Sequence, residues 1–187
     1  MARSEEAIVE AARGDIPARF VRLLGISISP DGHAAVALLD TNAVGSSDPY
    51  PLQVHCYRDD TGWHEAGSSN GYGWSVIGGG VVTYWDRAPA DVREVIVRWR
   101  DEEHRVPTAY GFFLFARWAV PEGDHFMSPV RFVKANGSTS ECMSPQEFED
   151  RRRAAQQMFD RLRAFAASRT SQEGNGIWIE RKEGKKS

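Results

Sequence analysis

Apolar and polar residues alternate along much of the chain, most clearly between positions 92 and 118. Two apolar runs there, Val92–Trp99 and Val106–Trp118, are rich in β-branched and aromatic side chains. A repeat close to every second residue is typical of β-strands that bury one face. The charged segment Arg100–Arg105 separates the two runs. The pattern therefore predicts a β-hairpin in which this charged segment is the turn.

Shorter runs of the same kind predict strands on both sides of this hairpin. The sequence Pro30-Asp31-Gly32 lies between the first two, and it favours a turn because proline presets φ and glycine accepts a positive φ. The first four runs predict a four-strand meander. The expected strands are Arg19–Ser29, His33–Leu39, Leu52–Arg58, Trp63–Ala66, Val81–Trp85 and Val130–Lys134.

Two segments carry the signals of helices. Ser4–Arg13 has acidic residues in its first turn and is followed by Gly14, a residue type that commonly ends helices. Residues 144–147, Ser-Pro-Gln-Glu, match the capping-box pattern and predict a helix over Pro145–Ser168. One apolar face is expected on this helix, made of Phe148, Ala155, Met158, Phe159, Leu162, Phe165 and Ala166.

These elements predict a mainly β protein, α+β overall. Short strands at roughly ten-residue spacing favour an antiparallel β-sandwich or a partly open barrel, with a short N-terminal helix and a long C-terminal helix. The chain folds either as one domain or as two small β modules joined by a Gly/Ser-rich loop or linker. The expected segments are residues 1–66, 67–80, 81–140, 144–168 and the polar tail 169–187.

Composition narrows the classes of partner and compartment. The 187 residues carry a net charge of −3, so there is no general basic field to hold a nucleic-acid backbone. The 19 Arg against 4 Lys are typical of a GC-rich bacterial genome. No apolar run approaches the roughly 18 residues that span a bilayer, and the first residues lack a secretory signal core. We expect a cytoplasmic protein with free thiols, no nucleic acid and no membrane partner.

Candidate chemical sites are weak. No two of the five histidines have the spacing of a helical zinc motif. Residues 101–104, Asp-Glu-Glu-His, lack a glycine for a metal-binding loop and have arginines close by, so we expect a solvated turn. His55 and Cys56 are neighbours on a predicted strand and should point to opposite faces. Cys142 precedes a helix, whose dipole can lower the pKa of a thiol. No catalytic residue, metal or cofactor is predicted.

Aromatic and small polar residues gather in the Gly/Ser-rich region, a composition typical of recognition surfaces. The alternative is that Trp63 and Trp74 fold back as core anchors over a sheet edge. A further tryptophan, flanked by Ile177 and Ile179, could add with them as a strand to a sheet edge of this or another chain. The candidate binding residues are Trp63, Asn70, Tyr72, Trp74 and Trp178.

Two functions remain open at this point. The first is a non-catalytic binding or assembly protein that acts through contacts with a protein partner or with itself, favoured because no catalytic group is evident. The second is a small-ligand-binding enzyme or carrier with a pocket in a curved sheet, where His33, His55 or His64 would act as acid–base groups. A deep pocket with two ionisable side chains in hydrogen-bond reach would favour the second.

Overall fold

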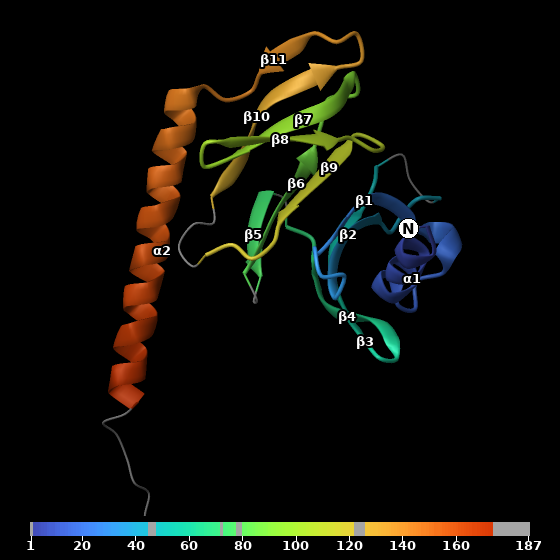
Figure 1. Cartoon of the computed structure of the whole chain (residues 1–187), viewed down its shortest axis with the longest axis horizontal. Coiled ribbons are helices and arrows are strands. Elements are labelled where there is room, and N and C mark those ends of the chain that lie inside the picture. Colours follow the sequence, from blue (N-terminus) through green and yellow to red (C-terminus); the bar gives the residue numbers. More distant parts are fainter. Residues whose placement is uncertain (1, 45–47, 72, 78–79, 122–125, 174–187) are drawn as a thin grey trace, which may run out of the picture.

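The computed structural model describes residues 2–44, 48–71, 73–77, 80–121 and 126–173 (Figure 1). The structure is mainly antiparallel β, with a helix near each end. The helical elements are α1 (Ala2–Arg13), a 3₁₀ turn (Ala18–Phe20) and α2 (Pro145–Glu173). The strands are β1 (Arg22–Ile28), β2 (Ala34–Asp40), β3 (Pro51–Asp59), β4 (Gly62–Ser69), β5 (Gly73–Ile77), β6 (Val81–Arg87), β7 (Val92–Trp99), β8 (Glu102–Pro107), β9 (Phe112–Arg117), β10 (Met127–Lys134) and β11 (Thr139–Glu141).

The strands form three antiparallel sheets, none of which closes into a barrel. Sheet A has the order β1-β2-β3-β4, sheet B has β5-β6-β9, and sheet C has β11-β10-β7-β8. The expected β1–β2 hairpin is confirmed, and Gly32 in its turn has a φ of 74°. The arrangement confirms a sandwich-like α+β fold.

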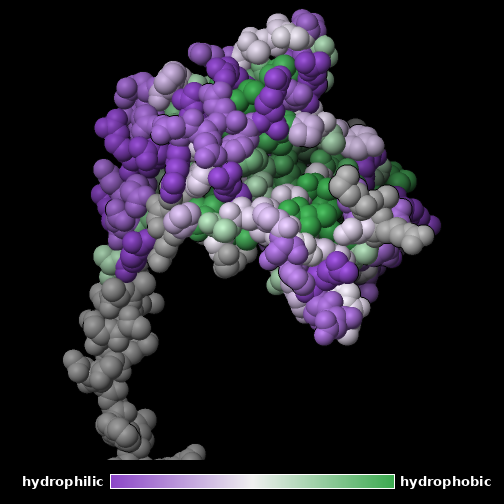
Figure 2. All heavy atoms as spheres, in the orientation of Figure 1, coloured by the Kyte–Doolittle hydropathy of each residue, from purple (hydrophilic) through white to green (hydrophobic). Residues whose placement is uncertain are grey.

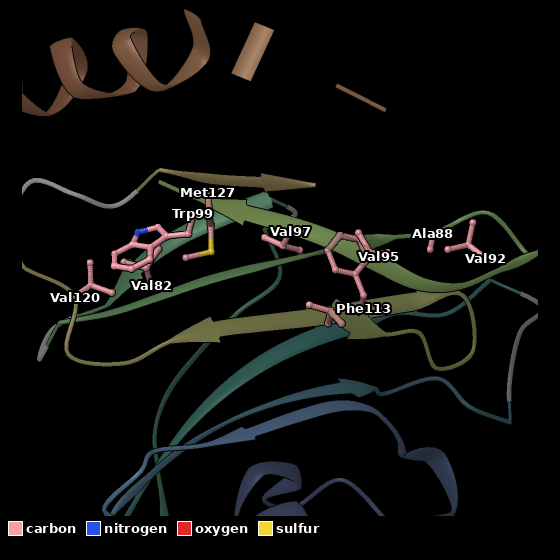
Figure 3. Close-up of a cluster of buried hydrophobic side chains, with 10 residues drawn as sticks. Val82, Ala88, Val92, Val95, Val97, Trp99, Phe113, Val120 and Met127 are labelled. Carbon is pink, nitrogen blue, oxygen red and sulfur yellow. The ribbon is translucent and has the colours of Figure 1, made fainter. Parts of the chain in front are cut away.

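The two helices and three sheets stack as successive layers. Alternate residues along the strands supply four buried clusters, which lie between α1 and sheet A, between sheets A and B, between sheets B and C, and between sheet C and α2. Figure 3 shows these layers one above another, with the cluster between sheets B and C drawn as sticks. Hydrophobic residues accordingly gather between the layers in Figure 2, while the coloured first part of α2 has a mostly hydrophilic surface.

The predicted pairing of the two apolar runs between residues 92 and 118 is wrong. β7 pairs with β8, Trp99 lies opposite Glu102, and the turn is only Arg100 and Asp101, where Arg100 takes a φ of 53°. The second apolar run, β9, instead pairs with β6 in sheet B. Charged residues can form β8 because it is an edge strand with solvent beside it.

The region predicted as a loop at 67–80 also contains strands. β4 continues to Ser69, and β5 begins at Gly73. Both are edge strands, where small and polar side chains are tolerated because burial is incomplete. The division of the chain into two modules stays a prediction, but the cluster between sheets A and B contains residues of both, such as Leu38 and Trp85.

Gly25 of β1 sets how closely sheets A and B approach each other. A Cβ atom at this position would lie 2.9 Å from Cβ of Leu114 on β9, too close for two carbon atoms. We expect Gly25→Ala to lower the free energy of unfolding by about 1–3 kcal/mol, because the sheets must separate to admit the methyl group. Urea titration measures the change. Gly71→Ala is the control, since a Cβ there meets nothing within 4 Å. Equal effects of both changes would contradict this account.

Ser144 caps α2 as the sequence predicts. Its Oγ accepts a hydrogen bond from the backbone N–H of Glu147 at 3.2 Å, while the Glu147 carboxylate accepts one from Arg151 at 2.7 Å instead of turning back to the cap. We expect Ser144→Ala to lower the free energy of unfolding by about 1 kcal/mol, because one backbone donor loses its partner. An unchanged unfolding midpoint in urea would show that the cap contributes nothing.

Candidate functional site

A stripe of polar residues runs along one face of β3, the face toward sheet B. Gln53, His55, Tyr57 and Asp59 alternate along this strand and therefore share that face. Gln53 is fully buried, and its Oε1 accepts a hydrogen bond from the buried hydroxyl of Thr83 on β6 at 3.2 Å. The Nε2 atom of Gln53 lies 2.7 Å from Nε2 of His55. The inner end of the stripe is thus a polar bridge between sheets A and B.

His55 is held as a neutral imidazole. Burial lowers its pKa, because the charged form loses solvation. The amide of Gln53 can donate only to an unprotonated ring nitrogen, which assigns the proton of His55 to Nδ1. Burial and this hydrogen bond both favour the neutral imidazole, so His55 accepts a hydrogen bond from Gln53 in the polar bridge between sheets A and B.

The outer end of the stripe forms the turn between β3 and β4. Oδ1 of Asp59 accepts hydrogen bonds from the backbone N–H of Thr61 at 2.8 Å and from its hydroxyl at 2.7 Å. The Nε2 atom of His64 lies 3.0 Å from the same oxygen, and the ring of His64 packs on Tyr57. The Thr61 hydroxyl is the main cause that lowers the pKa of Asp59 to about 2.

This hydroxyl, imidazole and carboxylate do not form a nucleophilic triad. In a triad the hydroxyl and the carboxylate bind different nitrogens of the imidazole, so that a proton can be taken on one side while the other side is held. Here the Thr61 hydroxyl, at 2.8 Å, and the Asp59 carboxylate both lie near Nε2 of His64. The arrangement stabilises the turn.

A hollow of about 660 Å³ lies beside this turn. His33, Arg58, Asp59 and Asp60 line it, and all four are exposed. His33 comes from the neighbouring β1–β2 turn. Solvated side chains at the tips of two hairpins do not exclude water from a reacting group, so the hollow gives little support to acid–base catalysis.

Arginines pair with two carboxylates of the acidic segment at 101–104, those of Glu102 and Glu103. Glu103 of β8 accepts hydrogen bonds from Arg98 at 2.5 Å and from Arg131, and Arg98 is the main cause that lowers the pKa of Glu103. Glu102 lies 3.4 Å from Arg117. Across the residues that the structure describes, no group of three or more His, Cys, Asp or Glu could hold a metal ion. The segment was expected to be a turn, but three of its four residues form the charged edge strand β8.

Both cysteines are free. Cys56 lies in the cluster under α1, on the opposite face of β3 from His55, as predicted. Cys142 lies before α2, at the other end of the stack. Desolvation raises the pKa of each thiol to about 11, so the lowering that a helix dipole can cause is not seen at Cys142. Neither side chain is a thiolate nucleophile near neutral pH.

The structure places only part of the predicted binding set. Trp63 is half-buried at the start of β4 and packs on the cluster under α1. Asn70 is exposed just after β4, and its Nδ2 donates a hydrogen bond to the Tyr50 hydroxyl at 3.3 Å. The backbone of Trp74 pairs with Tyr84 in sheet B, but its side chain lies outside the described residues. Tyr72 and Trp178 also lie outside them.

β4 is an open edge of sheet A. It pairs with β3 on one side only, and no other described strand pairs with it. Its second half, Ala66–Ser69, is exposed and carries only small, uncharged side chains. A shift in register opposite His55 and Cys56 places a bulge at Ala66. The unpaired N–H and C=O groups of such an edge can hydrogen-bond to another extended segment.

A groove of about 330 Å³ lies between α1 and the start of β4. It is lined by Ser4 and Ala7 of α1, by Arg58, and by Gly62 and Trp63 of β4. We call this the α1–β4 groove. Its lining is mainly apolar, so it can take an apolar side chain. Sequence reasoning found Trp63 but missed the contribution of α1, because Ser4 and Ala7 acquire meaning only once α1 packs on β4.

Comparison of the chain with known protein families, with curated proteins and with solved structures finds no match. None of the described helices is both long enough and apolar enough to cross a membrane. The geometry of the open edge, the groove and the polar stripe is therefore the basis for any functional conclusion.

The neutral state of His55 predicts a pH dependence of stability. Its pKa is lowered in the folded protein from 6.5, so the unfolded chain binds a proton more readily below that pH. Neutral His55 does not destabilise the fold above about pH 6.5. As the pH falls below this value, protonation favours the unfolded chain, and the free energy of unfolding decreases. We expect the free energy of unfolding to drop between pH 7.5 and 5.5, and to drop less in His55→Gln. Urea titrations at both pH values measure this, and equal drops in both proteins would exclude His55 as the cause.

Proposed function

We propose that this protein is a non-catalytic binding protein that acts through protein–protein contacts, and that it binds an extended segment of its partner along the edge of β4. The observation that carries the proposal is an unpaired edge of small, uncharged residues bordered by an apolar groove. In this mode of recognition, main-chain hydrogen bonds give affinity, and pockets for alternate side chains give specificity. The edge and the α1–β4 groove supply these two parts.

The contrast with the charged edge strand β8 supports the choice of β4. β8 of sheet C carries Glu102, Glu103 and Arg105, charges of the kind that keep edge strands from pairing with other chains. β4 lacks this protection over Ala66–Ser69. The bulge at Ala66 interrupts the edge, which suits a short segment better than a long flat strand.

The alternative, a small-ligand-binding enzyme or carrier, has less support. It needs a pocket in which two ionisable groups meet away from water. Within the described part of the chain, Asp59 of the stripe and the neighbouring His64 of β4 stabilise a turn, and His55 belongs to the bridge between two sheets.

The test screens displayed random twelve-residue peptides against the full chain. We expect selected peptides to alternate apolar residues and to slow amide hydrogen exchange in Gly62–Ser69, because a new strand bonds to the free edge. Ala7→Phe should fill the α1–β4 groove and weaken their binding at least about tenfold. Ala154→Phe, at an exposed alanine of α2, is the matched control and should change nothing.

Two results would contradict the proposal. One is a screen that yields no binding peptide. The other is a set of peptides that bind Ala7→Phe as well as the unaltered protein and protect amides elsewhere, which would place the binding surface away from β4.

A further inference from the structure

We propose that the segment bound at the β4 edge is residues 177–186 of a second copy of this chain, so that the protein associates with itself. This inference rests on the proposed function of the β4 edge and the α1–β4 groove, and it names their occupant. The segment reads Ile-Trp-Ile-Glu-Arg-Lys-Glu-Gly-Lys-Lys. It combines a short apolar stretch with a basic one, and each has a counterpart on the described surface.

The apolar stretch fits strand addition. On a strand added to sheet A, Trp178 lies on one face, and Ile177 and Ile179 lie on the other. α1 covers one face of sheet A beside β4, and the α1–β4 groove opens there with an apolar lining and a volume of about 330 Å³. Either register therefore places a large apolar side chain at the groove.

The basic stretch complements the charge around the groove. Residues 180–186 carry four cationic side chains against two carboxylates, and they include three of the four lysines of the whole chain. α1 exposes Glu6 and half-exposes Glu5, and β4 exposes Glu65. These three glutamates form no ion pair with any residue that the structure describes, whereas Glu10 is paired with Arg13. The unpaired carboxylates favour a cationic partner beside the apolar groove.

Distance assigns the segment to a second copy. α1 and α2 lie on opposite sides of the stack (Figure 1), and sheets A, B and C lie between them. Two spacings of about 10 Å separate sheet C from sheet A, before the thickness of α2 is added. From Glu173 to Ile177 the chain can extend at most about 14 Å. The segment therefore cannot reach β4 of its own copy.

A dimer in which each copy binds the C-terminal segment of the other leaves no binding surface unoccupied. Each copy offers one segment and one β4 edge, so two copies satisfy each other in a two-fold dimer, the commonest form of closed oligomer. The contact uses the same two surfaces on both copies. It leaves sheet C and its charged edge β8 outside the interface.

The first test measures self-association of the full chain by sedimentation velocity over a range of concentrations. We expect Trp178→Ala and Ala7→Phe each to weaken dimer formation at least about tenfold. The first change removes the apolar side chain that enters the groove, and the second fills the groove itself. The matched control is Ala154→Phe. Charge reversal at Lys185 and Lys186 together should also weaken the dimer, and Lys134→Glu on β10 should not. A monomeric unaltered protein, or a dimer that survives Trp178→Ala, would overturn the inference.

The second test separates this inference from the proposed function. A synthetic peptide of residues 174–187, labelled with a fluorophore, is titrated with the full-length Trp178→Ala protein, whose β4 edge is intact. We expect binding that weakens with added salt and is lost when Ala7→Phe is also present. If library peptides bind at β4 and this peptide does not, the inference is wrong and the proposed function stands. If neither binds, both are wrong.

Discussion

Burial of sheet B on both faces is the constraint on which the rest of the structure depends. Neighbouring residues of a strand point to opposite faces, yet Val81 and Val82 are both buried, and so are Phe112 and Phe113. A sheet that is covered on both sides needs mostly apolar residues on both faces of its strands. Sheets A and C must then each turn an apolar face toward sheet B, and their outer faces are left for α1 and α2 to cover.

Apolar contact alone does not fix how two sheets lie on each other, because the hydrophobic effect has no direction. Two specific contacts between sheets A and B supply the direction. Gly25 lets β1 approach Leu114 closely, and the buried Thr83 hydroxyl reaches Gln53 across the interface. Sliding either sheet would break the hydrogen bond from Thr83 to Gln53 Oε1 in a buried environment, where a lost polar contact is costly. The polar bridge between Gln53 and Thr83 is thus a determinant of packing.

Period-two alternation was enough to predict most strands and the fold class, but it could not predict their pairing. Phe112–Arg117 follows the charged segment closely, so it was assigned to the hairpin of β7. In the structure this strand pairs with β6 in sheet B, and both of its faces are buried. No local sequence signal distinguishes pairing with β6 from pairing with β7. The second half of β4 and the whole of β5 are missed because glycine and serine are typical of loops. In the candidate site, Trp63 could be predicted because aromatic residues gather in that part of the sequence. The role of Ala7 could not be predicted, because it arises only when α1 packs against β4 in the folded protein.

A stack of this kind restricts where a partner can bind. The inner faces are filled, so contacts with other molecules fall to the sheet edges and to the outer helices. At β8 the charges are paired within the same sheet, since Arg98 and Arg131 both bind Glu103. These ion pairs satisfy the side-chain charge of Glu103, and the charged side chains of β8 disfavour the pairing of another strand with it. At β4, no described strand pairs with the outer side of the main chain. The side chains of Ala66–Ser69 are small, and Glu65 forms no ion pair with a described residue. Other edge strands, such as β5, are also paired on one side only, so the proposal that a second strand binds at β4 depends on the small side chains of this edge and on the adjoining α1–β4 groove.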